Sequence, residues 1–111
     1  MANKLDYLTA LQAAIKQTHH CDVTHCETVP VHERVDVKTM WKGDVEVFDV
    51  SGHPEAKKCY AWSYHEEGRG PRVVAIFEKQ SVNSPEMAVK CAIFFNVQPA
   101  PYPRPNQNPD V

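Results

Sequence analysis

Three histidines and two cysteines lie within nine residues near the N-terminus, in the sequence THHCDVTHC (residues 18–26). Imidazole nitrogen and thiolate sulfur are ligands that zinc and copper accept. Cys21 and His25 are four positions apart and would share one face if a helix continued through them. One hypothesis is therefore a zinc or copper site within residues 19–26, with the ligands His20, Cys21, His25 and Cys26.

A second interpretation of this cluster is a helix end and loop rich in histidine and cysteine. The final turn of the helix would carry Lys16, His19 and His20, where positive or readily protonated side chains interact favourably with free carbonyls. His25 and Cys26 are adjacent and would point to opposite sides of an extended backbone. The paired C-x2-C spacing of structural zinc sites is missing. We therefore expect no cofactor, with metal binding as the alternative and a Cys21–Cys26 disulfide as another.

Cysteine and histidine side chains could also act together in nucleophilic catalysis. Cys59 or Cys26 with His53 or His65 would supply the thiol and the base. No nucleophile motif surrounds either cysteine, and the four glycines lack the spacing of a phosphate-binding loop. We expect no catalytic machinery, and an enzyme is the third hypothesis.

Aromatic side chains alternate in the segment CYAWSYHE (residues 59–66), followed by two arginines. On an open sheet face such a stripe can bind a ligand or a partner protein. The alternative is that the rings form core beneath the helices, because a four-strand sheet must bury one face. The candidate ligand or partner face consists of Tyr60, Trp62, Tyr64, Arg69 and Arg72.

Hydrophobic periodicity places these residues on helices and strands. Residues 3–18 show apolar side chains at helical spacing, and Ser84-Pro85-Glu86 is typical of a helix start, with a helix to about residue 95. Alternation predicts strands near residues 29–35, 40–50, 59–66 and 73–79. Pro30 cannot donate a ladder hydrogen bond, which favours an edge position for its strand. The apolar parity switches within 40–50, which indicates a bulge or a strand buried on both faces.

This order predicts an α+β fold, a two-layer sandwich with both helices on the same face of a four-strand antiparallel meander. We expect a single domain at residues 1–98. Residues 99–111 carry five prolines and few apolar side chains, which predicts a disordered proline-rich tail. The α-β-β-β-α order resembles that of double-stranded-RNA-binding domains, and Gly70–Val73 (GPRV) is similar to a loop of that family. The lysine-rich start of the family's last helix is replaced here by SPEMAVK, so the resemblance is one of element order and implies no RNA binding.

Composition sets the remaining expectations for the 111-residue chain. It contains 42% hydrophobic and 23% charged residues, as in globular proteins, and its net charge of −2 disfavours a nucleic-acid partner. No secretion signal or membrane-spanning run is visible, so we expect a cytoplasmic protein with reduced thiols and no membrane. The function expected is a non-catalytic binding or protein-interaction module for an unknown protein or small molecule, with a homodimer through the sheet edge or open face as one form of it.

Overall fold

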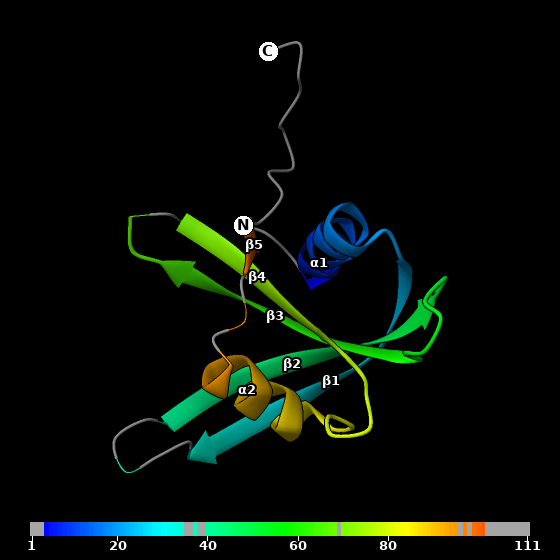
Figure 1. The fold of residues 1–111 in the computed structure, drawn as a ribbon. Helices are drawn as coiled ribbons and strands as arrows, with labels where there is room; N and C mark the ends of the chain where they lie inside the picture. Colours follow the sequence, from blue (N-terminus) through cyan, green and yellow to red (C-terminus); the bar gives the residue numbers. More distant parts are fainter. Residues whose placement is uncertain are drawn as a thin grey trace.

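A computed structural model describes residues 4–34, 37, 40–68, 70–95, 97 and 99–101. Its elements are α1 (Lys4–His19), β1 (Asp22–Arg34), β2 (Met40–Ser51), β3 (Lys58–Glu66), β4 (Gly70–Phe77), α2 (Pro85–Phe94) and β5 (Ala100–Pro101). The strands form one antiparallel sheet in chain order (Figure 1). The predicted α+β fold with a helix at each end of an antiparallel meander is confirmed, and within the described residues the meander has a fifth strand.

The sheet consists of two long hairpins that share little backbone pairing. β1 pairs with β2 along its length, and β3 pairs with β4 from Cys59↔Phe77 to Glu66↔Gly70. β2 and β3 pair only from Glu46↔Ala61 to Asp49↔Lys58. Beyond these four pairs the hairpins diverge, as Figure 1 shows, and we call the space between the diverging halves of β2 and β3 the fork.

Side chains close the fork from both faces of the sheet. The Ser63 N–H has no β2 partner and donates to the Tyr7 hydroxyl of α1, at 3.1 Å. Trp41 of β2 and Trp62 of β3 meet edge to face, with ring centroids 5.5 Å apart. Aromatic pairs in this geometry add stability beyond the area they bury. Helix and aromatic contacts thus hold the hairpins together where the ladder does not.

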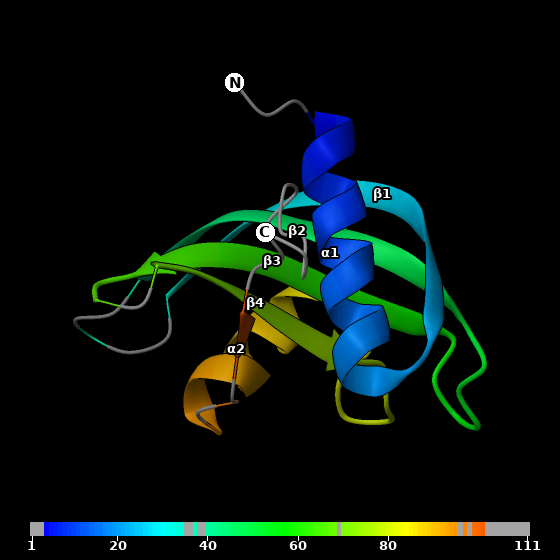
Figure 2. The same ribbon diagram turned by 90° about the horizontal axis from the view of Figure 1, so that it is seen from above.

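The two helices pack on opposite faces of the sheet, so the prediction that they share one face is wrong. The core consists of two clusters of buried side chains, one between the sheet and α2 and the other between the sheet and α1. Val47 belongs to the first cluster and its neighbour Phe48 to the second. The reason lies in β2, where residues 45–48 are buried in succession. The parity switch in the sequence therefore reflects a strand buried on both faces, and each face requires its own helix (Figure 2).

The first strand is longer than its sequence indicates. α1 ends at His19, and His20 has the left-handed φ of 61° that often terminates a helix. β1 then begins at Asp22, so much of the histidine- and cysteine-rich segment expected to be a loop is strand. A β-bulge between His25 and Glu27 accommodates Cys26. Residues 22–25 join the sheet because they pair with the end of β2.

The C-terminal boundary of the sheet also differs from the prediction. Ala100 and Pro101 were assigned to the tail that starts at residue 99, but they pair with Val73 and Arg72 of β4. The rest of that predicted tail, residues 102–111, lies outside the described residues. β1 occupies the other edge of the sheet, as Pro30 predicts. Neither α1 nor α2, the helices of the described part of the chain, has the length and apolar content needed to cross a membrane.

Candidate functional site

Helix α2 starts at a well-defined cap. The Ser84 hydroxyl accepts a hydrogen bond from the Met87 N–H at 3.2 Å, and Pro85 occupies the first helical turn, where its missing N–H costs nothing. Glu86 places a negative charge near the positive end of the helix dipole. These local interactions fix where the helix begins and which side chains face outward.

One face of α2 is buried against the sheet. Ala88, Val89 and Cys91 are buried and pack with core residues of all four long strands. The Lys90 ammonium lies 3.0 Å from a carboxylate oxygen of Glu33 and so ties the helix to β1. The buried side chains are small, which brings the helix axis close to the strands.

The opposite face of α2 is also apolar, and it is exposed. Met87 is 41% exposed, Phe94 65% and Phe95 78%. Single exposed apolar residues are ordinary in soluble proteins. Elsewhere in the described residues the large exposed apolar side chains are Leu5 on α1, Val37 between β1 and β2, Met40 on β2 and Tyr64 on β3. At α2, by contrast, three large apolar side chains are exposed together on one helix and its C-cap, and contiguous exposed apolar surface of this kind is typical of interaction sites.

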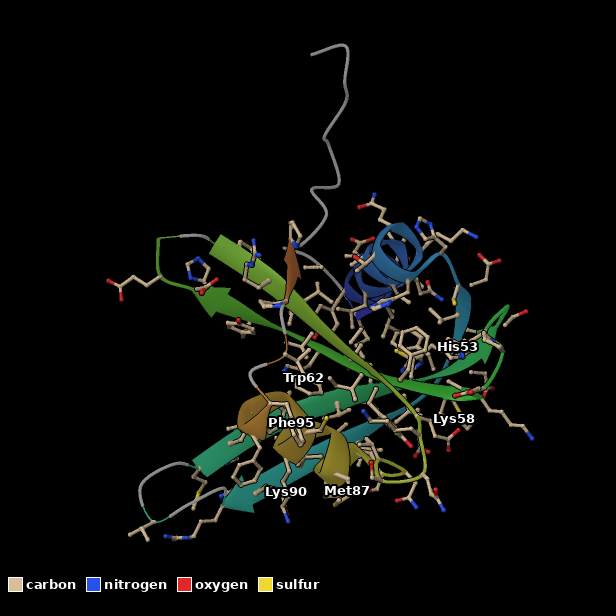
Figure 3. All side chains as sticks on the ribbon, in the orientation of Figure 1. His53, Lys58, Trp62, Met87, Lys90 and Phe95 are labelled. Carbon is tan, nitrogen blue, oxygen red and sulfur yellow. The ribbon has the colours of Figure 1, made fainter. Side chains whose placement is uncertain are left out.

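The exposed side chains of α2 line a groove with a volume of about 360 Å³. Its other wall is the tight turn before α2, closed by reciprocal hydrogen bonds of 3.0 and 2.9 Å between Lys79 and Val82. Figure 3 shows Met87, Lys90 and Phe95 at this surface, well away from His53 and Lys58. We call this surface the α2 groove, lined by Lys79, Ser81, Val82, Met87, Lys90, Cys91, Phe94 and Phe95.

The predicted aromatic face is divided by the structure. Tyr60 and Trp62 are each 4% exposed and lie in the core beneath α2. Tyr64, two residues further along β3, is exposed. The Arg72 Nε lies 3.6 Å from a carboxylate oxygen of Glu66, and the guanidinium donates to the Pro99 carbonyl at 3.3 Å. Arg69 lies outside the described residues.

The four candidate metal ligands have separate surroundings. His20 is exposed at the end of α1, and the buried Cys21 thiol donates to the His19 carbonyl at 3.4 Å. His25 turns toward Glu46, while Cys26 is exposed beside Lys58 at 3.6 Å. Within the described ranges, no three His, Cys, Asp or Glu side chains converge in a way that could hold a metal ion.

A buried carboxylate explains the position of His25. Glu46 is fully buried on the α1 face, where it accepts hydrogen bonds from Lys4 at 2.5 Å, Thr28 at 2.5 Å and His25 at 2.9 Å. Burial acts to raise the pKa of this carboxyl, but the three hydrogen bonds and the Lys4 charge together hold the pKa below its ordinary value. The four side chains form an ion network that joins α1, β1 and β2.

The cysteine and histidine pairs considered for catalysis are not assembled as nucleophile and base. Burial, with a smaller contribution from Cys21, raises the pKa of the Cys59 thiol to about 12, so this thiol stays protonated at neutral pH. The His53 ring accepts the N–H groups of Glu55 and Ala56 at 3.0 and 2.8 Å and organises the turn before β3. His65 is exposed on β3. Cys59 is therefore not an activated nucleophile, and Cys26, the other cysteine considered, is exposed beside Lys58.

Comparisons with protein-family models, with curated proteins and with solved structures found no match to this chain. The site therefore has to be judged from its own geometry.

The α2 groove was missed by the sequence reasoning, although a signal was present. The helix sequence PEMAVKCAIF contains only two charged residues, so it is apolar on nearly all sides. A helix of this kind is normally buried all round. The sequence pattern predicted the helix itself, but it also places Met87 and Phe94, which are seven residues apart, on a second apolar face that the sheet does not cover.

Proposed function

We propose that this protein is a non-catalytic interaction module that binds an apolar segment of a partner protein in the α2 groove. The observation that supports this most directly is the exposure of Phe94 and Phe95 beside a groove of about 360 Å³. Taking about 200 Å² for a whole ring, the exposed parts of these two side chains amount to roughly 300 Å². At about 25 cal/mol per Å², covering this area would contribute about 7 kcal/mol before the costs of association.

The size of the surface favours a short segment over a second copy of the chain. A stable interface buries about 800 Å² on each partner. With Met87 included, the exposed apolar side chains offer about half of that area. A groove of this volume lies within the range of about 300–1,000 Å³ that accommodates compact ligands. One or two large apolar side chains of a partner, such as leucine or phenylalanine, therefore fit it best.

The charges around the groove indicate which residues flank that apolar anchor. Lys79 is exposed at one wall, and Lys90 lines the groove while paired with Glu33. Positive charges at the rim of an apolar site favour acidic groups on the partner and disfavour basic ones. The preferred segment therefore carries aspartate or glutamate beside its apolar side chains.

The proposal is tested by selecting peptides from a random twelve-residue phage-display library on the immobilised full-length chain. We expect enriched peptides with large apolar residues beside Asp or Glu. Phe94→Ser and Phe95→Ser should each weaken a synthesised peptide by about tenfold or more, because each removes a buried ring from the complex. Leu5→Ser is the matched control, since Leu5 is 71% exposed but lies on α1, and it should leave the affinity unchanged.

Two results would contradict the proposal. Selected peptides that bind wild type and Phe94→Ser equally would place the binding surface elsewhere. A dimer in analytical ultracentrifugation that Phe94→Ser dissociates and Leu5→Ser preserves would assign the groove to a second copy of the chain.

A further inference from the structure

The two edges of the sheet differ in how their backbone is protected. The Val50 N–H donates to the Lys57 carbonyl, so the backbone N–H and C=O groups of Val50 point toward β3. Every second residue of β2 has the same orientation, and the backbone groups of the residues between them point toward β1. Pro30 lies opposite Asp44, a β2 residue whose backbone groups point toward β3. The backbone of Pro30 therefore points outward, and its missing N–H removes a hydrogen-bond donor from the edge. The bulge at Cys26 interrupts the same edge. Both features discourage another strand from pairing with β1.

The outer edge of β4 has neither feature over residues 74–77. The Glu78 N–H donates to the Lys58 carbonyl at 2.9 Å, so the backbone groups of Glu78 point toward β3. Because this direction alternates along a strand, those of Ile76 and Val74 also point toward β3. Those of Ala75 and Phe77 consequently point outward. Within the described part of the chain these outward groups have no hydrogen-bond partner, because β5 reaches only Arg72 and Val73.

The directions of the neighbouring segments argue against closure of this edge by the chain itself. β5 is antiparallel to β4, and Pro101 lies opposite Arg72, so the chain leaves β5 in the direction of Gly70. Before β5, the Val97 N–H donates to the Ala92 carbonyl at 3.1 Å, which ties this residue to α2. A four-residue stretch of β4, about 13 Å long, therefore lies between β5 and the turn at Lys79.

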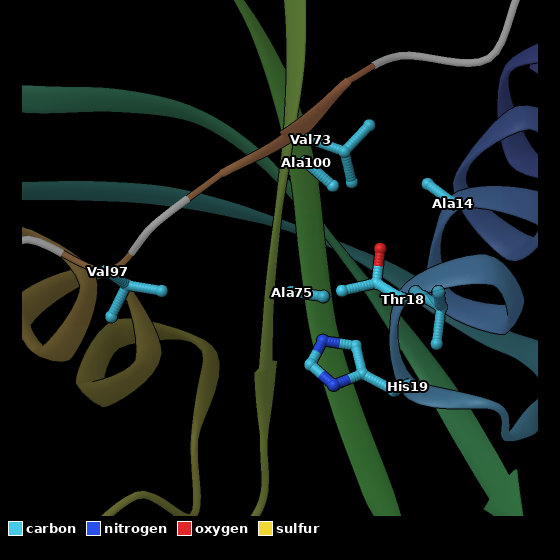
Figure 4. A pocket seen from close by; sticks show the side chains of 8 residues that line it. Ala14, Thr18, His19, Val73, Ala75, Val97 and Ala100 are labelled. Atoms are coloured by element: carbon cyan, nitrogen blue, oxygen red, sulfur yellow. The ribbon is translucent and has the colours of Figure 1, made fainter.

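A hollow lies beside this stretch on the α1 face of the sheet. Its volume is about 80 Å³, and Figure 4 shows Ala75 and Val73 of β4 on one side with Ala14, Thr18 and His19 of α1 on the other. Most of its lining is aliphatic. A cavity that holds a benzene ring measures about 150 Å³, so this hollow suits one small aliphatic side chain.

We infer that residues 74–77 of β4 accept an extended segment of a partner protein as an added strand, with one valine-sized side chain entering the hollow between α1 and β4. Added strands gain affinity from backbone hydrogen bonds and specificity from pockets that receive alternate side chains, and both features are present here. A second copy fits poorly, because its β1 edge carries Pro30 and its own residues 74–77, paired through their outward groups, would place the ring of Phe77 opposite Ala75, beside a hollow that suits only a small side chain. This site is independent of the α2 groove.

The test starts from a library of linear seven-residue peptides displayed on phage and selected on the Phe94→Ser variant, in which binding to the competing α2 groove is weakened. We expect peptides with Val, Ala or Ile at one fixed position among β-forming residues. Binding should slow hydrogen exchange of the Ala75 and Phe77 amides. Ala75→Pro should weaken binding about tenfold or more, because it removes one outward N–H and leaves the ladder with β3 intact.

His32→Pro is the matched control, since it makes the same backbone change at an outward position of β1 and should not affect binding. In Ala100→Leu, the larger side chain on β5 would fill the hollow, so binding of the same peptides should weaken. This second variant keeps the inference testable if Ala75→Pro does not fold. The inference is overturned if selection yields no such peptides, or if bound peptides leave exchange at Ala75 and Phe77 unchanged. It is also overturned if wild type forms a dimer that Ala100→Leu disrupts.

Discussion

The ion network around Glu46 provides the sharpest quantitative test of the fold. Glu46→Gln keeps the shape of the side chain and removes its charge, so three donors from Lys4, Thr28 and His25 lose a charged acceptor. Hydrogen bonds to charged groups contribute about 1.5–3 kcal/mol each, but Lys4 is half exposed and its contribution is reduced by solvent screening. We expect Glu46→Gln to lower the free energy of unfolding by about 2–4 kcal/mol at pH 7.

The matched control is an ion pair with the same geometry on the surface. Lys58 and Asp49 are also 2.5 Å apart, but their side chains are 36% and 59% exposed. Exposed pairs contribute little to stability, because water and salt screen the two charges. Asp49→Asn should therefore cost much less than Glu46→Gln, as measured by urea denaturation. Equal costs for the two variants would refute the argument that burial makes the Glu46 network important.

Acid titration gives a second, independent check on Glu46. Because the pKa of Glu46 in the folded protein lies below its ordinary value of 4.5, the charge-dependent stability is fully present above that pH. It is lost as the pH falls through the lower folded pKa. The stability difference between wild type and Glu46→Gln should therefore shrink in acid. A difference that stays constant from neutral pH to below the folded pKa would show that the cost arises from packing.

Further predictions concern the core, the thiols, the end of α1 and metal. Trp62→Ala should lower the free energy of unfolding by about 3–5 kcal/mol in a thermal or urea melt, because a large buried ring is removed from the fork. With Ellman's reagent at pH 8, the exposed Cys26 should react in the native state, whereas Cys59, with its pKa raised to about 12, should react only on unfolding. His20→Gly should raise the stability by up to about 1 kcal/mol, because glycine adopts the positive φ without strain, and a urea melt would measure the gain. A strong chelator should leave the melting temperature unchanged, and a fall of more than about 5 °C would support the metal hypothesis.

Local sequence patterns predicted the elements well where one physical signal dominated. Ser84-Pro85-Glu86 marks the start of α2 because capping and proline geometry act within a single turn. The neighbouring strands β3 and β4 were also predicted, since alternating apolar residues define each of them locally. Pro30 correctly indicated an edge strand, because a missing donor is tolerated only where no neighbouring strand needs it.

Features that depend on contacts distant in sequence were not predictable in the same way. Which face each helix covers depends on how β2 and β3 pair, and the four consecutive buried residues of β2 allowed either a bulge or two covered faces. The first half of β1 looks like a polar loop, yet it is a strand because the end of β2 lies beside it. β5 contains a proline and only two residues, so no local pattern distinguishes it from a tail.

The exposed phenylalanines of α2 are difficult to explain by folding alone. The contacts that hold the helix on the sheet are made by Ala88, Val89 and Cys91 and by the Lys90–Glu33 pair. Polar residues at 94 and 95 would leave all of these contacts in place, and surface substitutions of this kind usually change stability by less than about 0.5 kcal/mol. Folding therefore gives no advantage to aromatic rings at these positions, and exposed rings increase the risk of aggregation. The proposed binding of a partner in the α2 groove would supply the missing advantage, because the two rings would become buried there.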